Sequence, residues 1–212
     1  MPHFTDLTGL AGAASAITAA LLLIPGIALL PQRYLAAALA AVFALALIPF
    51  GDLPIAAYLR GATGDLSITT LVLLWSALLS RLRTANPDAV RKARVNSDER
   101  AALPGLVALT AVMFYPLALG IGMFDPYRMG YGDALFIGAL LLLALLAWLR
   151  NFLQIVLCIA LAALAWAIGW YESTNLWDYL LDPFVSIYAL WISVAVMWKM
   201  RSKPASGQTP EK

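Results

Sequence analysis

Apolar residues fill seven long runs of the chain, and short polar stretches separate these runs. The runs cover residues 10–30, 34–50, 66–82, 103–123, 134–149, 152–170 and 180–198. Each is close to the roughly 20 residues that an α-helix needs to cross a hydrocarbon core about 30 Å thick. Because unpaired backbone N–H and C=O groups are costly in lipid, each run is expected to be a helix. The pattern therefore predicts an all-α fold, a polytopic transmembrane helical bundle of about seven helices.

Composition supports a membrane protein rather than a soluble domain. Of the 212 residues, 62% are hydrophobic and 12% are charged, whereas soluble globular domains contain about 25% charged residues. We expect one transmembrane domain over residues 1–203, followed by a disordered cytoplasmic tail over residues 204–212. No internal repeat is visible, which argues against a transporter built from inverted repeats.

The basic residues predict the orientation of this bundle. With the N-terminus outside and the C-terminus in the cytoplasm, 12 of the 14 Lys and Arg residues fall on the cytoplasmic side, as the positive-inside rule requires. The largest cytoplasmic feature is then a basic loop over residues 83–102, and the outer loops are residues 51–65, 124–133 and 171–183. The predicted location is a bacterial inner membrane.

Several kinds of chemistry lack the residues that they need. The chain has one cysteine, Cys158, and one histidine, His3, so neither a metal centre nor a bound cofactor is predicted. No charged residue or histidine lies at the expected hydrocarbon depth, and proton relays and ion-coupled carriers usually depend on such residues. Membrane lipids and a membrane-protein partner are the expected contacts, and nucleic acid is not expected.

Carboxylates gather on the predicted outer side, where eight of the twelve Asp and Glu residues lie. Helix capping explains many of them, because an Asp at a helix start accepts hydrogen bonds from unpaired backbone N–H groups. This explanation covers Asp6, Asp65, Asp133, and Asp178 or Asp182. Asp52, Asp125 and Glu172 remain as candidate catalytic acids or bases.

The same outer loops contain the candidate substrate-binding residues. Arg60 and Arg128 are the two outer cations, and their guanidinium groups suit a phosphate or carboxylate. Tyr127, Asn175 and Asp178 complete this set. The structural alternative is that Arg60 pairs with Asp52 or Asp65, and that Arg128 pairs with Asp125 or Glu172, to tie the loops together.

Two outer loops are expected to be partly helical. Residues 54–60 can form a short helix that Gly61 ends. In the third outer loop, Asn175, Asp178 and Asp182 fall on one helical stripe through their i, i+3 and i+7 spacing.

Three function classes fit these features. The favoured one is a non-catalytic subunit or assembly factor of the cell envelope with a polar site on its outer face. The alternative is a membrane enzyme that acts on a lipid or lipid-linked phosphate at the outer interface, and the third is a carrier or flippase.

Overall fold

Helices make up most of the chain, so the all-α prediction is confirmed. The computed structural model describes residues 4–24, 26–27, 30–83 and 97–201. Most of the predicted basic loop and the whole predicted tail lie outside these residues.

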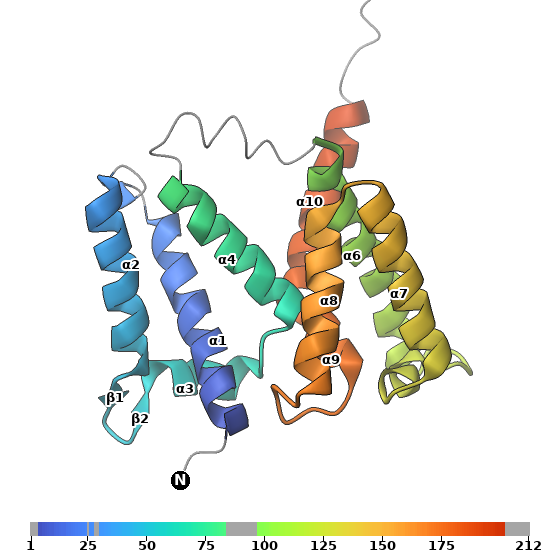
Figure 1. Cartoon of the computed structure of the whole chain (residues 1–212), viewed down its shortest axis with the longest axis horizontal. Coiled ribbons are helices and arrows are strands. Elements are labelled where there is room, and N and C mark those ends of the chain that lie inside the picture. Colours follow the sequence, from blue (N-terminus) through green and yellow to red (C-terminus); the bar gives the residue numbers. More distant parts are fainter. Residues whose placement is uncertain (1–3, 25, 28–29, 84–96, 202–212) are drawn as a thin grey trace, which may run out of the picture.

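In the part of the chain that the structure describes, seven long helices correspond to the seven apolar runs (Figure 1). They are α1 (Phe4–Ala20), α2 (Gln32–Leu47), α4 (Ile68–Arg83), α6 (Ser97–Ala118), α7 (Ala134–Leu149), α8 (Leu153–Ala167) and α10 (Pro183–Arg201). The first helix begins at Phe4 rather than at residue 10, because Asp6 fits the first turn of a helix, where a negative charge is favourable. A single 3₁₀ turn, η1 (Leu21–Leu23), follows it.

The smaller elements lie together at one end of the molecule, the lower end in Figure 1. They are β1 (Pro49–Phe50), β2 (Leu53–Pro54), α3 (Ile55–Thr63), η3 (Pro126–Gly130) and α9 (Leu176–Leu180). The two strands form an antiparallel hairpin in which Phe50 faces Leu53. The helix predicted over residues 54–60 is present but ends at Gly64 rather than Gly61, because Gly64 adopts a positive φ of 74° that favours glycine.

The helices pack in two groups that α4 connects. One group contains α1, α2, α3 and α4, and the other contains α6 to α10. The largest core lies in the second group, where Val107, Phe114, Ile155 and Val185 are buried against one another. Because α4 contacts α1 on one side and α8, α9 and α10 on the other, its start helps to fix how the two groups meet.

One helical stretch among the described residues, Thr5–Leu23, is long and apolar enough to cross a membrane. Six further apolar helices are shorter, at 10–17 residues each. Length and composition by themselves do not separate a spanning helix from a buried helix of a soluble protein or a signal sequence. The helical fold is thus shown, and its placement in a membrane is taken up below as a proposal.

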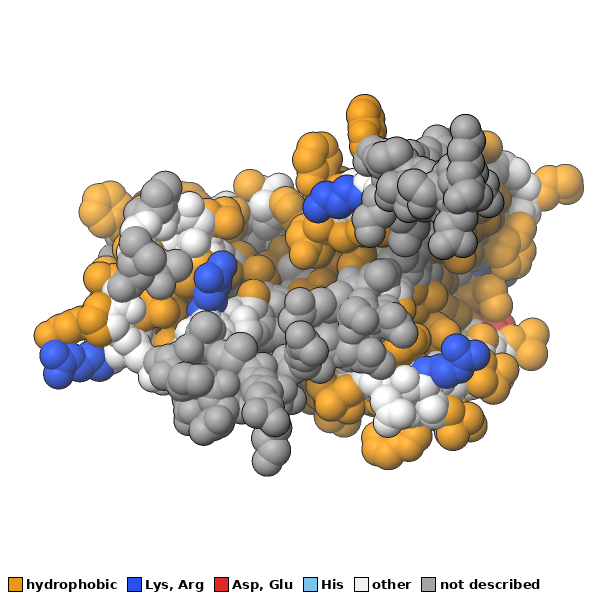
Figure 2. Space-filling view, turned by 90° about the horizontal axis from the view of Figure 1, so that it is seen from above, with side chains coloured by type: hydrophobic (Ala, Val, Ile, Leu, Met, Phe, Trp, Pro, Cys, Tyr) orange, Lys and Arg blue, Asp and Glu red, His pale blue; other side chains and the backbone are white. Residues whose placement is uncertain are grey.

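Charges separate to the two ends of the molecule. All carboxylates whose side chains are described lie at the end with the short elements, which we call the acidic end: Asp6, Asp52, Asp65, Asp125, Asp133, Glu172, Asp178 and Asp182. The opposite, basic end carries the exposed side chains of Arg33, Arg81, Arg150 and Lys199. Figure 2 looks onto the basic end, where Lys and Arg side chains stand among hydrophobic ones.

Candidate ligand-binding cavity

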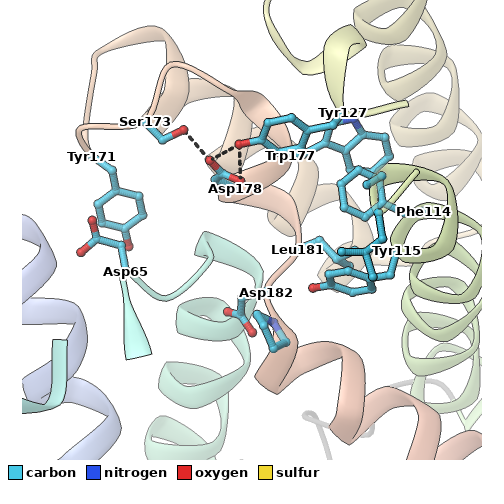
Figure 3. A pocket seen from close by; sticks show the side chains of 13 residues that line it. Asp65, Phe114, Tyr115, Tyr127, Tyr171, Ser173, Trp177, Asp178, Leu181 and Asp182 are labelled. Atoms are coloured by element: carbon cyan, nitrogen blue, oxygen red, sulfur yellow. Dashed lines mark hydrogen bonds between the residues drawn. The ribbon is translucent and has the colours of Figure 1, made fainter. Parts of the chain in front are cut away.

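A cavity of about 520 Å³ opens at the acidic end, where the two helix groups meet. Its polar lining consists of Asp65, Tyr115, Tyr127, Tyr171, Ser173, Asp178 and Asp182. The apolar lining consists of Phe114, Ala118, Leu119, Trp177, Leu181 and Pro183. Figure 3 shows Tyr171 and Asp65 on one side of the cavity and Phe114, Tyr115, Tyr127 and Trp177 on the other.

Asn175 holds η3 and α9 together on the aromatic side of the cavity. Its side-chain oxygen accepts a hydrogen bond from the backbone N–H of Trp177 at 2.9 Å, which caps α9. Its amide nitrogen donates to the backbone oxygen of Tyr127, also at 2.9 Å. Asn175 is fully buried and lies directly against Gly130, so both sides of its amide are used in fixing this corner of the fold.

Asp178 accepts hydrogen bonds from two neutral hydroxyl groups. The Ser173 hydroxyl donates to it at 2.5 Å and the Tyr127 hydroxyl at 3.0 Å, as Figure 3 shows. Burial, together with the adjacent Asp178 carboxylate, raises the pKa of Tyr127 well above its usual range. Tyr127 therefore stays a neutral donor at physiological pH.

Asp182 joins the starts of α4 and α10. One carboxylate oxygen accepts from the backbone N–H of Ser67 at 2.8 Å and from the hydroxyl of Thr70 at 2.5 Å. The other accepts from the backbone N–H of Val185 at 2.8 Å, which caps α10. The exposed fraction of Asp182 is 5%. A single buried carboxylate thus connects the two helix groups at the floor of the cavity.

Tyr171 and Tyr179 stack beside the cavity, with ring centroids 5.2 Å apart. The Tyr171 hydroxyl donates to the backbone oxygen of Leu66 at 2.7 Å, and the Tyr179 hydroxyl donates to that of Ser173 at 2.8 Å. Burial raises the pKa of both phenols. Each therefore remains protonated and fixes the backbone around the loop before α9.

Trp177 forms the centre of an aromatic cluster behind the cavity. Its ring lies between Phe114, at a centroid distance of 4.4 Å, and Phe136, at 4.5 Å. Its indole N–H donates to the backbone oxygen of Pro126 at 2.9 Å. This packing joins α6, α7, α9 and η3, so the aromatic wall is a rigid part of the core.

Arg60 lies beside the cavity in contact with three carboxylates. Its Nε is 2.6 Å from Asp65, and its other nitrogens lie 3.3 Å from Asp6 and 3.8 Å from Glu172. The hydrogen bonds with Asp65 raise the pKa of Arg60 further. Gly9 of α1 lies against the pair, because a Cβ there would come within 2.3 Å of both side chains. Arg60 therefore ties α1, α3 and two loops together.

Replacing Arg60 by glutamine is expected to lower the free energy of unfolding by on the order of 2 kcal/mol, since its side chain is 19% exposed and three carboxylates lose their cation. Arg128 is exposed on η3, so Arg128→Gln should change the free energy of unfolding by less than about 0.5 kcal/mol. Thermal unfolding followed by circular dichroism would compare the two. Equal effects would contradict the tying role of Arg60.

The structure brings only some of the predicted site residues to the cavity. Tyr127 and Asp178 line it, and Asn175 lies behind its wall. The other candidates lie outside the lining: Asp52, Asp125, Arg128 and Glu172, all exposed, and Arg60. Asp125 accepts from the backbone N–H of Tyr127 and caps η3.

Two local predictions need correction. Asp65 was expected to cap the helix that starts near it, but its carboxylate binds Arg60, and the hydroxyl of Ser67 accepts the N–H of Thr70 at the start of α4 instead. Asn175, Asp178 and Asp182 do not share one helical stripe. The chain is extended at Leu181, the residue that ends α9, so Asp182 lies outside that helix.

Other predictions agree with the structure. Asp133 caps α7 by accepting from the backbone N–H groups of Leu135 and Phe136. Asp182 caps α10, and the alternative pairing of Arg60 with Asp65 is present.

Sequence reasoning missed the importance of Tyr171, Tyr179 and Asp182. Tyr171 lies at the start of a predicted outer loop, yet its exposed fraction is 4%. A tyrosine pair eight residues apart around a loop gives no periodic signal. Ser67 and Thr70, which donate hydrogen bonds to Asp182, lie more than 100 positions away from it in the chain.

Comparisons with protein-family models, curated proteins and solved structures yield no match to this chain. The geometry of the cavity and the surface of the helices therefore carry the functional argument.

Proposed function

We propose that this protein is a non-catalytic, multi-pass membrane subunit or assembly factor whose cavity at the acidic end is a binding site on the outer side of a bacterial inner membrane. Helix α7 is the observation that carries this proposal. Its 16 residues, ALFIGALLLLALLAWL, contain no charged or hydrogen-bonding side chain apart from the indole of Trp148.

Exposure separates α7 from a core helix of a soluble protein. A helix that is apolar all round is normally buried in a large core or in lipid. In α7, Phe136 and Ala147 are buried, whereas Leu135 is 78% exposed and Leu141 70% exposed. α10 likewise exposes Ile187, Trp191 and Trp198. Such surfaces are favourable against hydrocarbon and costly against water.

The separation of charges supports the orientation. At one end lie Arg33, Arg81, Arg150 and Lys199, and at the other lie all the carboxylates whose side chains are described, with Arg60 and Arg128 as the basic residues described there. This distribution fits a bundle whose basic end is cytoplasmic. α7 is about 24 Å long at 1.5 Å per residue, somewhat less than the roughly 30 Å of an average hydrocarbon core. A local thinning of the bilayer accommodates that difference at modest cost.

The hydrogen bonds of the cavity favour binding over catalysis. Ser173 donates to Asp178, but it also accepts from the backbone N–H of Asn175, as in a structural turn. The phenols of Tyr127 and Tyr171 are held neutral. Among the described residues, the lining contains no Lys or Arg, and Arg60 is surrounded by carboxylates. These features weigh against the alternative of an enzyme for lipid phosphates.

Two cysteine variants test the membrane placement and orientation. In a Cys158→Ala background, Asp52→Cys places an exposed thiol in the β1–β2 turn, and Gln32→Cys places one at the basic end. In intact cells, a membrane-impermeant maleimide should label Asp52→Cys and not Gln32→Cys, and after lysis it should label both. Extraction of the chain by salt without detergent would contradict membrane insertion, and the reversed labelling pattern would contradict the orientation.

The subunit role is tested in the same membranes. Native nanodiscs should contain a second protein in fixed stoichiometry with this chain, identified by mass spectrometry. Repeated recovery of the chain without any protein partner would contradict that role.

A further inference from the structure

We infer that the cavity at the acidic end binds an organic cation, a primary or methylated ammonium group. This inference rests on the proposed function, in which the cavity is a binding site, and it adds the chemical class of the ligand.

The charge of the cavity is the first step of the argument. Asp178 and Asp182 both line it, and neither takes part in an ion pair among the described residues. Their hydrogen-bond donors are neutral: two hydroxyl groups for Asp178, and a hydroxyl and two backbone N–H groups for Asp182. The cavity therefore carries negative charge that the described part of the chain does not neutralise.

The burial of Asp182 makes that charge significant. Ionised carboxylates with an exposed fraction as small as 5% are normally paired, because removing them from water is costly. A carboxylate also has about four positions at which it can accept hydrogen bonds. Asp178 receives two donors and Asp182 receives three, so a further donor can be accommodated. A cationic ligand would supply the missing charge, and a primary ammonium group would supply a hydrogen-bond donor as well.

The aromatic residues narrow the ligand to an organic cation. Phe114, Tyr115, Tyr127 and Tyr171 contribute to the lining beside the two carboxylates, and Figure 3 shows their rings on opposite sides of the space. Aromatic rings attract ammonium groups through their quadrupole and also cover attached methyl groups, which an inorganic cation does not have. Anions are disfavoured, since no cation lines the cavity among the described residues.

The size and position of the cavity fit a small ammonium compound or the headgroup of a lipid. About 520 Å³ lies within the range of ordinary small-molecule sites. The exposed apolar residues Leu119, Ile121 and Met123 follow α6 at the same end of the molecule. An ethanolamine or choline headgroup would bring the same ammonium chemistry as a free amine.

The test uses the full chain in nanodiscs of phosphatidylglycerol, which has no amine, titrated with choline and monitored by calorimetry. The matched ligand is 3,3-dimethylbutan-1-ol, which has the shape of choline without its charge. We expect choline to bind at least tenfold more tightly than the alcohol. Equal binding of the two compounds, or preferential binding of inorganic phosphate, would overturn the inference.

Three variants test whether the charge of Asp178 holds the cation. Asp178→Asn should weaken choline binding at least tenfold, and Asp178→Glu, which keeps the charge, should weaken it less than threefold. Asp133→Asn is the matched control, because this carboxylate caps α7 outside the cavity, and it should leave the affinity unchanged. A folded Asp178→Asn protein with wild-type affinity, or a Glu variant as weak as Asn, would overturn the inference.

A second preparation distinguishes the two sources of the ammonium group. Nanodiscs that contain phosphatidylethanolamine or phosphatidylcholine should compete with free choline if the headgroup enters the cavity, and should not compete if the ligand is a free amine. Either result is consistent with an organic-cation site. Failure of the inference leaves the proposed membrane role intact, because that role is decided by maleimide labelling and extraction.

Discussion

Asp182→Ala is expected to lower the free energy of unfolding by about 3 kcal/mol, the largest effect of any single carboxylate at the acidic end. The substitution removes the cap of α10 and leaves the N–H of Ser67 and the hydroxyl of Thr70 without their acceptor, all in a buried position. A lost cap costs about 1 kcal/mol, and each buried donor left unsatisfied costs about 1–3 kcal/mol. Thermal unfolding followed by circular dichroism in detergent would measure the loss.

Asp133→Ala is the matched control for Asp182. It removes a cap from α7 at an exposed position, so the expected loss is about 1 kcal/mol. Asp182→Asn should recover much of the stability, because the amide oxygen can still accept hydrogen bonds. If Asp182→Ala and Asp133→Ala lost the same stability, the connection between α4 and α10 would not depend on this carboxylate.

Gly130→Ala should be strongly destabilising, by about 3 kcal/mol. A Cβ at this position would lie 1.8 Å from the Asn175 side-chain oxygen and 2.8 Å from the ring of Trp177. Asn175 is fully buried and cannot turn away without losing the cap of α9 and its bond to Tyr127. Overpacking of this kind typically costs 1–3 kcal/mol, and the lost cap adds about 1 kcal/mol.

Gly138→Ala provides a comparison of opposite sign. Gly138 lies within α7, and nothing lies within 4 Å of the position that its Cβ would take. Alanine in a helix interior is more favourable than glycine by about 0.5–1 kcal/mol. Thermal unfolding should therefore show a decrease for Gly130→Ala and a small increase for Gly138→Ala. If Gly130→Ala left the stability unchanged, the packing of η3 against α9 would not depend on the close contact between Gly130 and Asn175.

The amino-acid sequence does not reveal that Gly130 and Gly138 differ in their surroundings. Both residues stand in ordinary sequence contexts, and no local pattern separates them. The contact between Gly130 and Asn175 joins segments about 45 residues apart, so it exists only once η3 and α9 have packed. Similarly, the pairing of Arg60 with Asp65 could be inferred from nearby positions, whereas its contacts with Asp6 and Glu172 depend on α1 and the loop before α9.

The sequence by itself determined the seven long helices, the separation of charges to the two ends, and local caps such as that of Asp133. Those features follow from hydrophobic run length and from short-range hydrogen bonding. Only the tertiary structure decided which polar residues share the cavity. Asp178 and Tyr127 were predicted as site residues, but Asp65, Tyr115 and Tyr171 reach the same cavity from separate parts of the chain. Such a convergence depends on how helices pack, and helix packing depends on side-chain shape across long sequence separations rather than on periodicity.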